Sequence, residues 1–272
     1  MLLAVDVGNT NTVVGVFDGP TLRRNFRFES SRTRTSDEYG ILLLELFRAR
    51  DVDAGAIDSA IVSCVVPPLQ ATITETIREF LRVEALVVGP GTRTGLPVLA
   101  DNPREVGADR IVNSVAVFAR YGRAAIVVDF GTATTFDCVS AKGEYLGGSI
   151  CPGVGITSDA LFRAAAKLPR VEIQKPPSVL GRNTIHAIQS GLLFGYVAMV
   201  DGLVERLRAE MNEPDCAVVA TGGIAALVAP ESKTIQAVDE HLTLDGLRLI
   251  HDRNVRQEAG VKGRRREGDE PG

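Results

Sequence analysis

The sequence predicts an α/β fold with a duplicated core, in which each half is a mixed β-sheet flanked by helices. A short motif occurs twice, as Asp6-Val7-Gly8-Asn9-Thr10 near the start and as Asp129-Phe130-Gly131-Thr132-Ala133 in the middle. An apolar run precedes each copy, as in a buried strand that turns directly into a second strand. Strand and helix patterns alternate after each copy, and a hydrophobic content of 45% suffices for a sizeable core.

The first half predicts a three-stranded start followed by alternating helices and strands. Residues 1–18 have the pattern of two strands around the first turn, and 21–31 that of a third. Residues 36–50 carry an apolar face at helical spacing, with Ser36 as the expected cap and acidic residues in the first turn. The remaining expected elements are a buried strand over 60–65, a helix over 67–82 that begins at two prolines, a short strand over 86–88, a loop rich in Gly and Pro over 90–105, and a helix over 106–121.

The second half begins with the second motif copy, from residue 125. Each copy is expected to lead to a further glycine turn, at Asp18-Gly19 and at Gly147-Gly148. A long helix is predicted over 184–210, capped by Asn183 or Thr184.

Two glycines one turn apart in that helix, Gly191 and Gly195, allow a second helix to approach closely, either within the chain or in a dimer. A strand over 217–220 ends in Thr221-Gly222-Gly223, and a further helix follows. We therefore expect domains over 1–122 and 123–254, and a charged, disordered tail over 255–272.

Composition argues against several classes of function. The 272 residues carry a net charge of −4, without the basic excess of many nucleic-acid-binding proteins. No uninterrupted run of about 18 apolar residues occurs, and the N-terminus lacks a secretory pattern. The four cysteines form no Cys-x-x-Cys pair, which argues against a zinc site or a disulfide framework. We expect a cytoplasmic protein that binds neither nucleic acid nor a membrane.

The repeated motif has the chemistry of a phosphate-binding hairpin. Glycine lets the backbone approach an anion, and turn amides with Thr and Asn side chains can donate hydrogen bonds to phosphate oxygens. The aspartate can hold a cation or its water shell. A plain β-hairpin explains one copy equally well, but two copies that both place Asp at the strand end favour phosphate binding.

A second candidate for chemistry is Asp109, which follows Gly107 at the start of a predicted helix and precedes Arg110. A carboxylate there can accept the proton of an attacking alcohol, and a guanidinium can hold a carboxylate substrate. The alternative is that Asp109 only favours the helix N-terminus through the helix dipole.

Together these motifs resemble the type III pantothenate kinase family of the actin-like ATPase and sugar-kinase superfamily. The resemblance covers residues 1 to about 253 and includes the segments 101–110, 147–153 and 221–223. It implies two actin-like (ribonuclease H-like) domains with ATP in the cleft between them, assembled as a homodimer. The implied reaction transfers the γ-phosphate of ATP to pantothenate, giving 4′-phosphopantothenate in the first step of coenzyme A synthesis.

The resemblance also implies roles for individual residues. Asp109 is the catalytic base, and Asp6 engages the Mg²⁺ shell. Asp129 holds K⁺ or NH₄⁺, although from its residue type alone it is equally a second magnesium contact. The residues expected to bind ATP are Asp6, Val7, Gly8, Asn9, Thr10, Asn11, Thr12, Val13, Thr132, Thr134, Gly222 and Gly223. Those expected to bind pantothenate are Gly107, Ala108, Asp109, Arg110 and Thr184, the last from the neighbouring subunit unless it is only a helix cap.

One departure and two alternatives accompany this interpretation. Some family members place an aromatic residue where Leu99-Ala100 stand here, so the shape of the substrate pocket is left open. A non-catalytic ATP-binding regulatory protein of the accessory-factor type is one alternative, and another ATPase or small-molecule kinase of the superfamily is the second. No P-loop or Rossmann glycine motif occurs.

Overall fold

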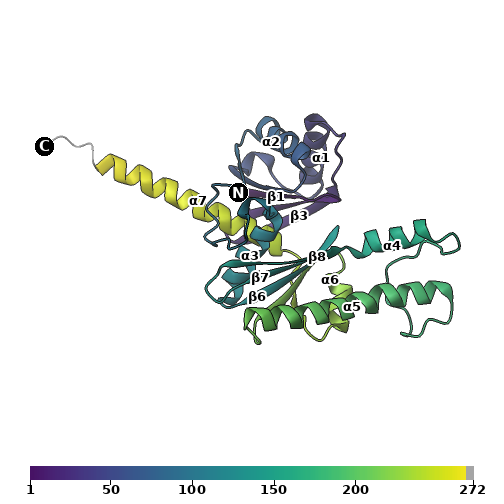
Figure 1. Ribbon diagram of the computed structural model, residues 1–272. Coiled ribbons are helices and arrows are strands. Elements are labelled where there is room, and N and C mark those ends of the chain that lie inside the picture. The colour runs from purple at the N-terminus through teal and green to yellow at the C-terminus, as the bar shows by residue number, and fades with distance from the viewer. Residues whose placement is uncertain (268–272) are drawn as a thin grey trace. The chain divides into compact units, whose positions relative to one another are not determined.

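The computed structural model describes residues 1–267, with side chains through Val255, and divides into two compact units (Figure 1). Unit 1 comprises Met1–Leu96, Asn102–Ala116 and the chain from Thr243, and unit 2 comprises Pro97–Asp101 and Val117–Leu242. The sequence places the division at 122/123. In the structure it falls within helix α3 (Ala108–Tyr121), and the C-terminal helix belongs to unit 1.

Unit 1 is a mixed five-stranded sheet in the order β3-β2-β1-β4-β5. Strand β1 pairs antiparallel with β2 and parallel with β4. The strands of unit 1 are β1 Leu2–Val7, β2 Asn11–Asp18, β3 Thr21–Glu29, β4 Ser59–Cys64 and β5 Ala85–Val87. The helices are α1 Ser36–Ala49, α2 Pro67–Leu81 and α7 Leu242–Glu267, with short 3₁₀ turns at Ala54–Ala56 and Pro103–Glu105.

Unit 2 repeats this sheet, because its order β8-β7-β6-β9-β10 places each strand in the position of its counterpart in unit 1. Strand β6 likewise pairs antiparallel with β7 and parallel with β9. The predicted duplicated α/β core is thereby confirmed. The strands of unit 2 are β6 Ala125–Phe130, β7 Ala133–Val139, β8 Tyr145–Pro152, β9 Ala217–Gly222 and β10 Ala237–Val238. Its helices are α4 Val154–Ala164, α5 Thr184–Met211 and α6 Ala225–Val228, with a 3₁₀ turn at Ala229–Glu231.

Each central strand has one face against a hydrophobic core. In β1, Leu3, Val5 and Val7 pack with side chains from α1 and α2, and the corresponding residues of β6 pack with side chains from α5 and α6. Because side chains alternate along a strand, Asp6 and Asp129 lie on the opposite face of their sheets. Burial of these aliphatic side chains stabilises each sheet by about 1.5–3 kcal/mol per residue, and this fixes the position of the aspartates at the strand ends.

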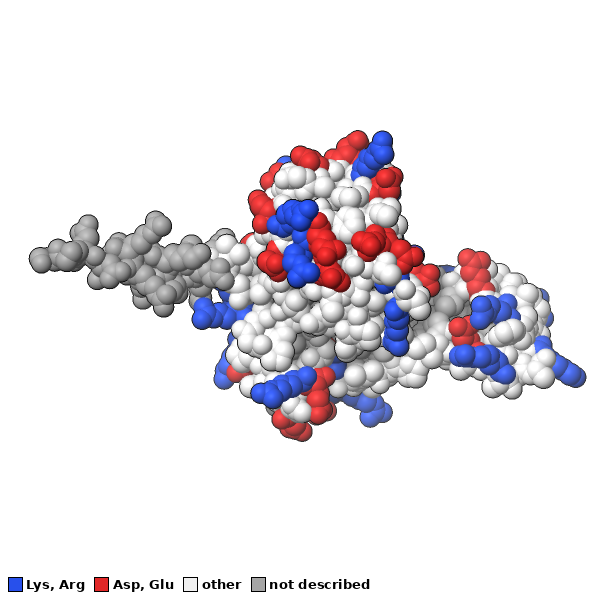
Figure 2. Space-filling view, turned by 90° about the horizontal axis from the view of Figure 1, so that it is seen from above, with Lys and Arg blue, Asp and Glu red and all other residues white. Residues whose placement is uncertain are grey.

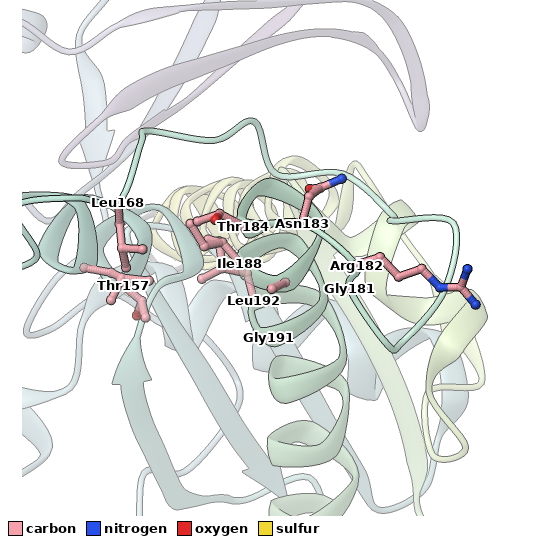
Figure 3. Close-up of a pocket in the computed structure, with 11 residues that line it drawn as sticks. Thr157, Leu168, Gly181, Arg182, Asn183, Thr184, Ile188, Gly191 and Leu192 are labelled. Carbon is pink, nitrogen blue, oxygen red and sulfur yellow. The ribbon is translucent and has the colours of Figure 1, made fainter.

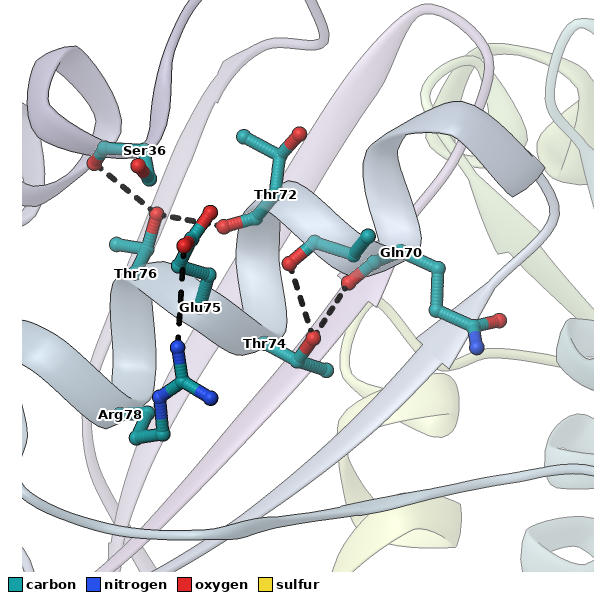
Figure 4. Close-up of polar contacts among 8 residues, drawn as sticks. Ser36, Gln70, Thr72, Thr74, Glu75, Thr76 and Arg78 are labelled. Atoms are coloured by element: carbon teal, nitrogen blue, oxygen red, sulfur yellow. Dashed lines mark hydrogen bonds and ion pairs between the residues drawn. The ribbon is translucent and has the colours of Figure 1, made fainter.

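Helices α1 and α2 lie against each other over the sheet of unit 1. The buried Thr76 hydroxyl on α2 lies 3.1 Å from the carbonyl of Ser36 on α1 and 2.8 Å from that of Thr72 in its own helix (Figure 4). Gly40 on α1 faces the ring of Phe80, where a side chain would collide with the aromatic carbons. These contacts explain why α1 carries a glycine in its interior despite the low helix propensity of that residue.

Several local expectations differ from the structure. Thr35 rather than Ser36 caps α1, because its hydroxyl accepts from the Glu38 amide while the Glu38 carboxylate accepts from the Thr35 amide. Gly147 and Gly148 lie inside β8 instead of forming a turn, and the hairpin turns at Gly143, whose φ is +77°. The helix α4 is an element that the sequence analysis does not anticipate.

The C-terminal segment, which was expected to be disordered from residue 255, also differs from the prediction. Helix α7 continues to Glu267, since the segment 255–267 is rich in Arg, Lys, Glu and Gln, which have good helix propensity. The remainder of the predicted tail, 268–272, lies outside the described residues.

Helix α5 is long and apolar, with a mean hydropathy of 1.5 over its most apolar window, and it is the one described helix that meets the length and hydropathy criteria for crossing a bilayer. The sequence analysis expects no such segment. Side chains of α5, including Leu193, Val197, Val200 and Val204, are buried in the core of unit 2, as in the core helix of a globular domain.

On the face seen in Figure 2, acidic and basic side chains are interspersed rather than gathered by sign.

Candidate active site

The first predicted phosphate turn joins β1 to β2. The Gly8 amide donates to the carbonyl of Asn11 (3.0 Å), which closes the turn and leaves the Asn9 and Thr10 side chains exposed. A side chain at Gly8 would come within 3.0 Å of that same carbonyl. The turn therefore presents amides and short polar side chains to solvent, as an anion-binding turn requires.

The second predicted phosphate turn repeats this geometry between β6 and β7. The Gly131 amide donates to the carbonyl of Ala133 (3.0 Å), and Thr132 is exposed at the tip. The Gly153 amide, which follows β8, donates to the Thr132 carbonyl (3.1 Å). A side chain at Gly153 would collide with the carbonyl oxygen of Thr132, so this glycine lets the chain after β8 lie directly against the turn.

Asp129 has polar neighbours on both sides. Its cross-strand partners are Thr135 on β7 and Thr221 on β9. Gly222 lies against the carboxylate, since a side chain there would come within 2.7 Å of Asp129 Oδ1, and its φ of +94° favours glycine. The Thr-Gly-Gly motif therefore contributes to the surroundings of Asp129, beyond its predicted contact with adenosine.

Two residues that the sequence analysis does not single out, Asp137 and Tyr145, form hydrogen bonds that reach Thr135, the cross-strand partner of Asp129. The fully buried Asp137 carboxylate accepts hydrogen bonds from Thr135 Oγ1 (3.2 Å) and from the hydroxyl of Tyr145 (3.1 Å) on β8. These contacts connect the strand after the second turn to β8. The sequence held one signal for Asp137, namely an acidic residue inside an apolar strand. Asp137 lies outside the repeated motif, so the motif does not point to it.

Not every predicted ATP contact exposes its side chain. Val7 and Thr12 are buried; Val7 lies in the core of unit 1, and the Thr12 hydroxyl lies 2.9 Å from that of Ser30. Thr134 is also buried, and its hydroxyl has no hydrogen-bond partner. At these positions only the backbone is available to a ligand in this conformation, whereas Asn9, Thr10, Asn11, Thr132 and Gly131 are exposed.

The predicted base segment lies close to the end of β4 in unit 1. Gly107 faces Val65, whose amide donates to the carbonyl of Val7 at the end of β1 (3.1 Å). A side chain at Gly107 would lie 2.6 Å from Asp109 Oδ1, so this glycine makes room for the carboxylate. The predicted substrate segment 107–110 and the strand that ends at the first turn are thus brought together.

The half-buried carboxylate of Asp109 is held over the first turn of α3. Its Oδ1 accepts a hydrogen bond from the Arg110 amide (2.8 Å). Burial raises the pKa of Asp109, although that hydrogen bond and the charge of Arg110 oppose the rise. A carboxylate with a raised pKa at the start of a helix is a better proton acceptor than an ordinary exposed aspartate.

No group of three or more His, Cys, Asp or Glu side chains suited to a metal ion occurs in the described part of the chain. Single carboxylates lie near the ends of β1 and β6, and each is followed by a turn with exposed polar side chains. This arrangement suits a cation that takes only part of its ligands from the protein. Mg²⁺ in nucleotide sites commonly takes one or two carboxylates, with phosphate oxygens and water completing its shell. The residues present therefore fit a cation that arrives with a phosphorylated ligand.

Thr184 lies in a separate place, at the start of α5 in unit 2. Asn183 caps this helix, as predicted, through a hydrogen bond from the His186 amide to its side chain (2.8 Å). Thr184 lines a pocket of roughly 710 Å³ together with Thr157, Ile188 and Leu192, while Arg182 points away from these residues (Figure 3). The structure therefore does not unite Thr184 with the Asp109 segment within either unit.

Comparison with known proteins identifies the family. A sequence model described as type III pantothenate kinase matches residues 2–206. The type III pantothenate kinase of Anaeromyxobacter sp. (strain Fw109-5) is 59% identical over 93% of this chain and 100% of its own length. The protein of the same name from Myxococcus xanthus is 58% identical over 93% of this chain and 99% of its own length. This chain belongs to the type III pantothenate kinase family.

Solved structures show that the fold is shared more widely. A Campylobacter jejuni protein assigned to the Baf family of transcriptional activators superposes with a TM-score of 0.60 at 16% identity, over 93% of this chain and 99% of its own. A Sinorhizobium meliloti protein described as a 2-dehydro-3-deoxygalactonokinase gives a TM-score of 0.53 at 15% identity, over 92% and 96%. The duplicated actin-like fold is thereby confirmed, and at these identities the likeness concerns the fold alone.

The packing of Gly153 against the second turn leads to a first prediction. We expect Gly153→Ala to displace the Thr132 carbonyl and to weaken ATP binding about tenfold or more, since overpacking against backbone costs about 1–3 kcal/mol. Gly155→Ala is the matched control, because nothing lies within 4 Å of a side chain there and alanine favours the helix. Calorimetric titration with ATP and thermal melting of both variants test this, and equal behaviour of the two would contradict it.

Proposed function

We propose that this protein transfers the γ-phosphate of ATP to the primary hydroxyl of pantothenate, giving 4′-phosphopantothenate in coenzyme A biosynthesis. Identity of 59% over the full length of a type III pantothenate kinase supports the reaction. The observation that carries the assignment of residues is the carboxylate of Asp109, half-buried at the start of α3 with a raised pKa. Phosphoryl transfer needs mainly positioned reactants and neutralised charge, with one group to accept the proton of the attacking alcohol.

Asp109 is the proposed general base. One carboxylate oxygen is held by the Arg110 amide, which limits the motion of the group and supports its use as a positioned base. Arg110 is proposed to hold the carboxylate of pantothenate, for which a guanidinium supplies paired donors. Gly107 and Ala108 complete the proposed substrate segment with backbone groups.

The two hairpin turns are proposed to bind the phosphates of ATP. In the first, Gly8, Asn9, Thr10 and Asn11 supply amide and side-chain donors, and in the second Thr132 does so; Val7, Thr12, Val13 and Thr134 contribute backbone only. Asp6 is proposed to engage the shell of Mg²⁺, which neutralises phosphate charge when bound. Asp129 is proposed to hold K⁺ or NH₄⁺, with Thr135 and Thr221 as its neighbours. Gly222 and Gly223 are proposed to lie against adenosine.

A homodimer is proposed through the exposed side of α5. Gly191 and Gly195 are exposed with nothing within 4 Å of an added side chain, which suits close approach of a second helix. Large apolar side chains are exposed nearby on the same unit, among them Leu180 at 75% and Ile185 at 49%. Thr184 next to this surface is proposed to reach the substrate of the partner subunit. We also propose a cytoplasmic location.

The accessory-factor alternative, a protein that binds ATP without turnover, is not favoured. The Campylobacter jejuni structure would be the support for this alternative, but at 16% identity its likeness to this chain extends to the fold only. A base such as Asp109, positioned by a hydrogen bond and with a raised pKa, has no use in a protein that only binds ATP.

A second prediction tests the base. We expect Asp109→Asn to lower kcat about 10²–10⁴-fold, because the variant can no longer accept the proton. Asp37→Asn is the matched control: Asp37 is an exposed aspartate in the first turn of α1 and shares only the favourable position at a helix start. Pantothenate-dependent ATP turnover and thermal stability are measured for both, and similar turnover in the two variants would reduce Asp109 to a helix-start residue.

The pH profile gives a third prediction from the same residue. The base acts only when deprotonated, so turnover is lost as the pH falls through the pKa of Asp109. Because that pKa is raised, we expect the acidic limb of kcat/KM at a higher pH than an ordinary aspartate would give. A profile that stays flat down to the range of an unperturbed aspartate would contradict this.

A fourth prediction tests the shared site. If Asp109 and Thr184 of different subunits form one site, two defective variants, Asp109→Asn and Thr184→Ala, complement each other when their subunits exchange. An equal mixture forms about half heterodimers with one intact site each, so we expect about a quarter of wild-type activity. An activity equal to the mean of the two separate variants would show that each subunit works alone.

A further inference from the structure

Arg32 lies against the first phosphate turn, in the segment between β3 and α1 that the proposed function leaves unused. Its guanidinium donates to the side-chain oxygen of Asn9 (3.3 Å), at the exposed tip of the turn. The Ser30 amide donates to the Thr10 carbonyl (3.0 Å), so the chain that leads to Arg32 runs directly beside the turn. Both elements belong to unit 1.

The segment that carries Arg32 is fastened on both sides. Before it, Ser30 lies 2.9 Å from the buried Thr12 hydroxyl. The buried Tyr39 hydroxyl accepts from the Ser31 amide (2.8 Å) and lies 3.0 Å from the Ser31 carbonyl. After it, Thr35 closes the capping box of α1. Fixing the backbone on both sides lowers the entropy that Arg32 would lose on binding a ligand.

The charge of Arg32 is available to a ligand. Its one hydrogen-bond partner among the described residues is the neutral Asn9, and no carboxylate of the described chain pairs with it. By contrast, Arg23 on β3, the strand before this segment, is paired with Asp18 at 2.7 Å. A guanidinium carries five donors, of which this bond uses one, and its geometry matches phosphate oxygens.

We propose that Arg32 is a further binding residue for the phosphates of ATP, which it reaches from the outer side of the first turn. The inference rests on the proposed function, because it assumes that this turn binds ATP. Arg32 adds to the turn a positive charge that its glycine, asparagine and threonine residues lack. It would therefore favour the highly charged triphosphate over nucleotides with fewer phosphates.

The test compares nucleotide affinities of three full-length variants by calorimetric titration. We expect Arg32→Ala to weaken ATP binding about 10- to 100-fold, the range for a hydrogen bond to a charged group, and to change AMP binding little. Arg32→Lys should retain part of the ATP affinity. Arg23→Ala is the matched control, because it removes the same charge from the end of β3 opposite to the first turn and should leave ATP affinity unchanged.

A double-variant cycle separates direct contact from support of Asn9. If Arg32 acts only by holding Asn9, then Arg32→Ala has no further effect in the Asn9→Ala background, and the proposal is overturned. It is also overturned if Arg32→Ala and Arg23→Ala bind ATP alike, or if Arg32→Ala weakens ATP and AMP equally.

Wild-type phosphorylation of pantothenate is measured on the same preparations. If the wild-type protein phosphorylates pantothenate and Arg32→Ala binds ATP as the wild type does, only the inference about Arg32 is overturned. If Arg32→Ala selectively loses ATP binding but the wild-type protein does not phosphorylate pantothenate, the proposed function is overturned and the inference about Arg32 holds. A wild-type protein that does not bind ATP defeats both.

Discussion

Each half of this protein depends on one constraint, the end of a buried central strand at an exposed glycine turn. The apolar residues of β1 and β6 fix these strands within their cores, so that the next outward-facing position at each strand end is an aspartate. The turn then closes with a single amide-to-carbonyl hydrogen bond of 3.0 Å in both halves. Hydrophobic burial thereby positions the two carboxylates and the polar side chains of the two turns at the ends of the central strands.

The two halves use this shared plan differently. Around Asp129 the neighbouring strands supply Thr135 and Thr221, whereas the corresponding neighbours of Asp6 are Val13 and Ser63. Under the proposed function, the two threonines beside Asp129 suit a cation held partly by protein oxygens, and the neighbours of Asp6 suit a cation held mainly by phosphate and water. The duplication thus gives two strand ends of similar backbone with different neighbouring side chains.

Much of this arrangement was predictable, because the strands and long helices have strong periodicity. The apolar run that leads into each glycine turn predicted both hairpins, and the apolar spacing after Asn183 predicted α5 with its cap. The contacts between distant segments were not predictable. Nothing local shows that Gly153 packs on the second turn, that Asp137 accepts from Tyr145, or that Thr134 faces inward, since each depends on how β8 pairs with β7. The predicted turn at Gly147-Gly148 was wrong for the same reason. Two glycines favour a turn locally, but pairing with β7 keeps them in β8.

The central claim is that the Asp109 segment and the two turns serve one reaction, phosphorylation of pantothenate. It is tested most directly by ATP consumption of the purified protein with Mg²⁺, with and without pantothenate, in potassium and in sodium buffer. We expect turnover that requires pantothenate and is faster in potassium. A folded protein that binds ATP but consumes none when pantothenate is added, in either buffer, would contradict the account.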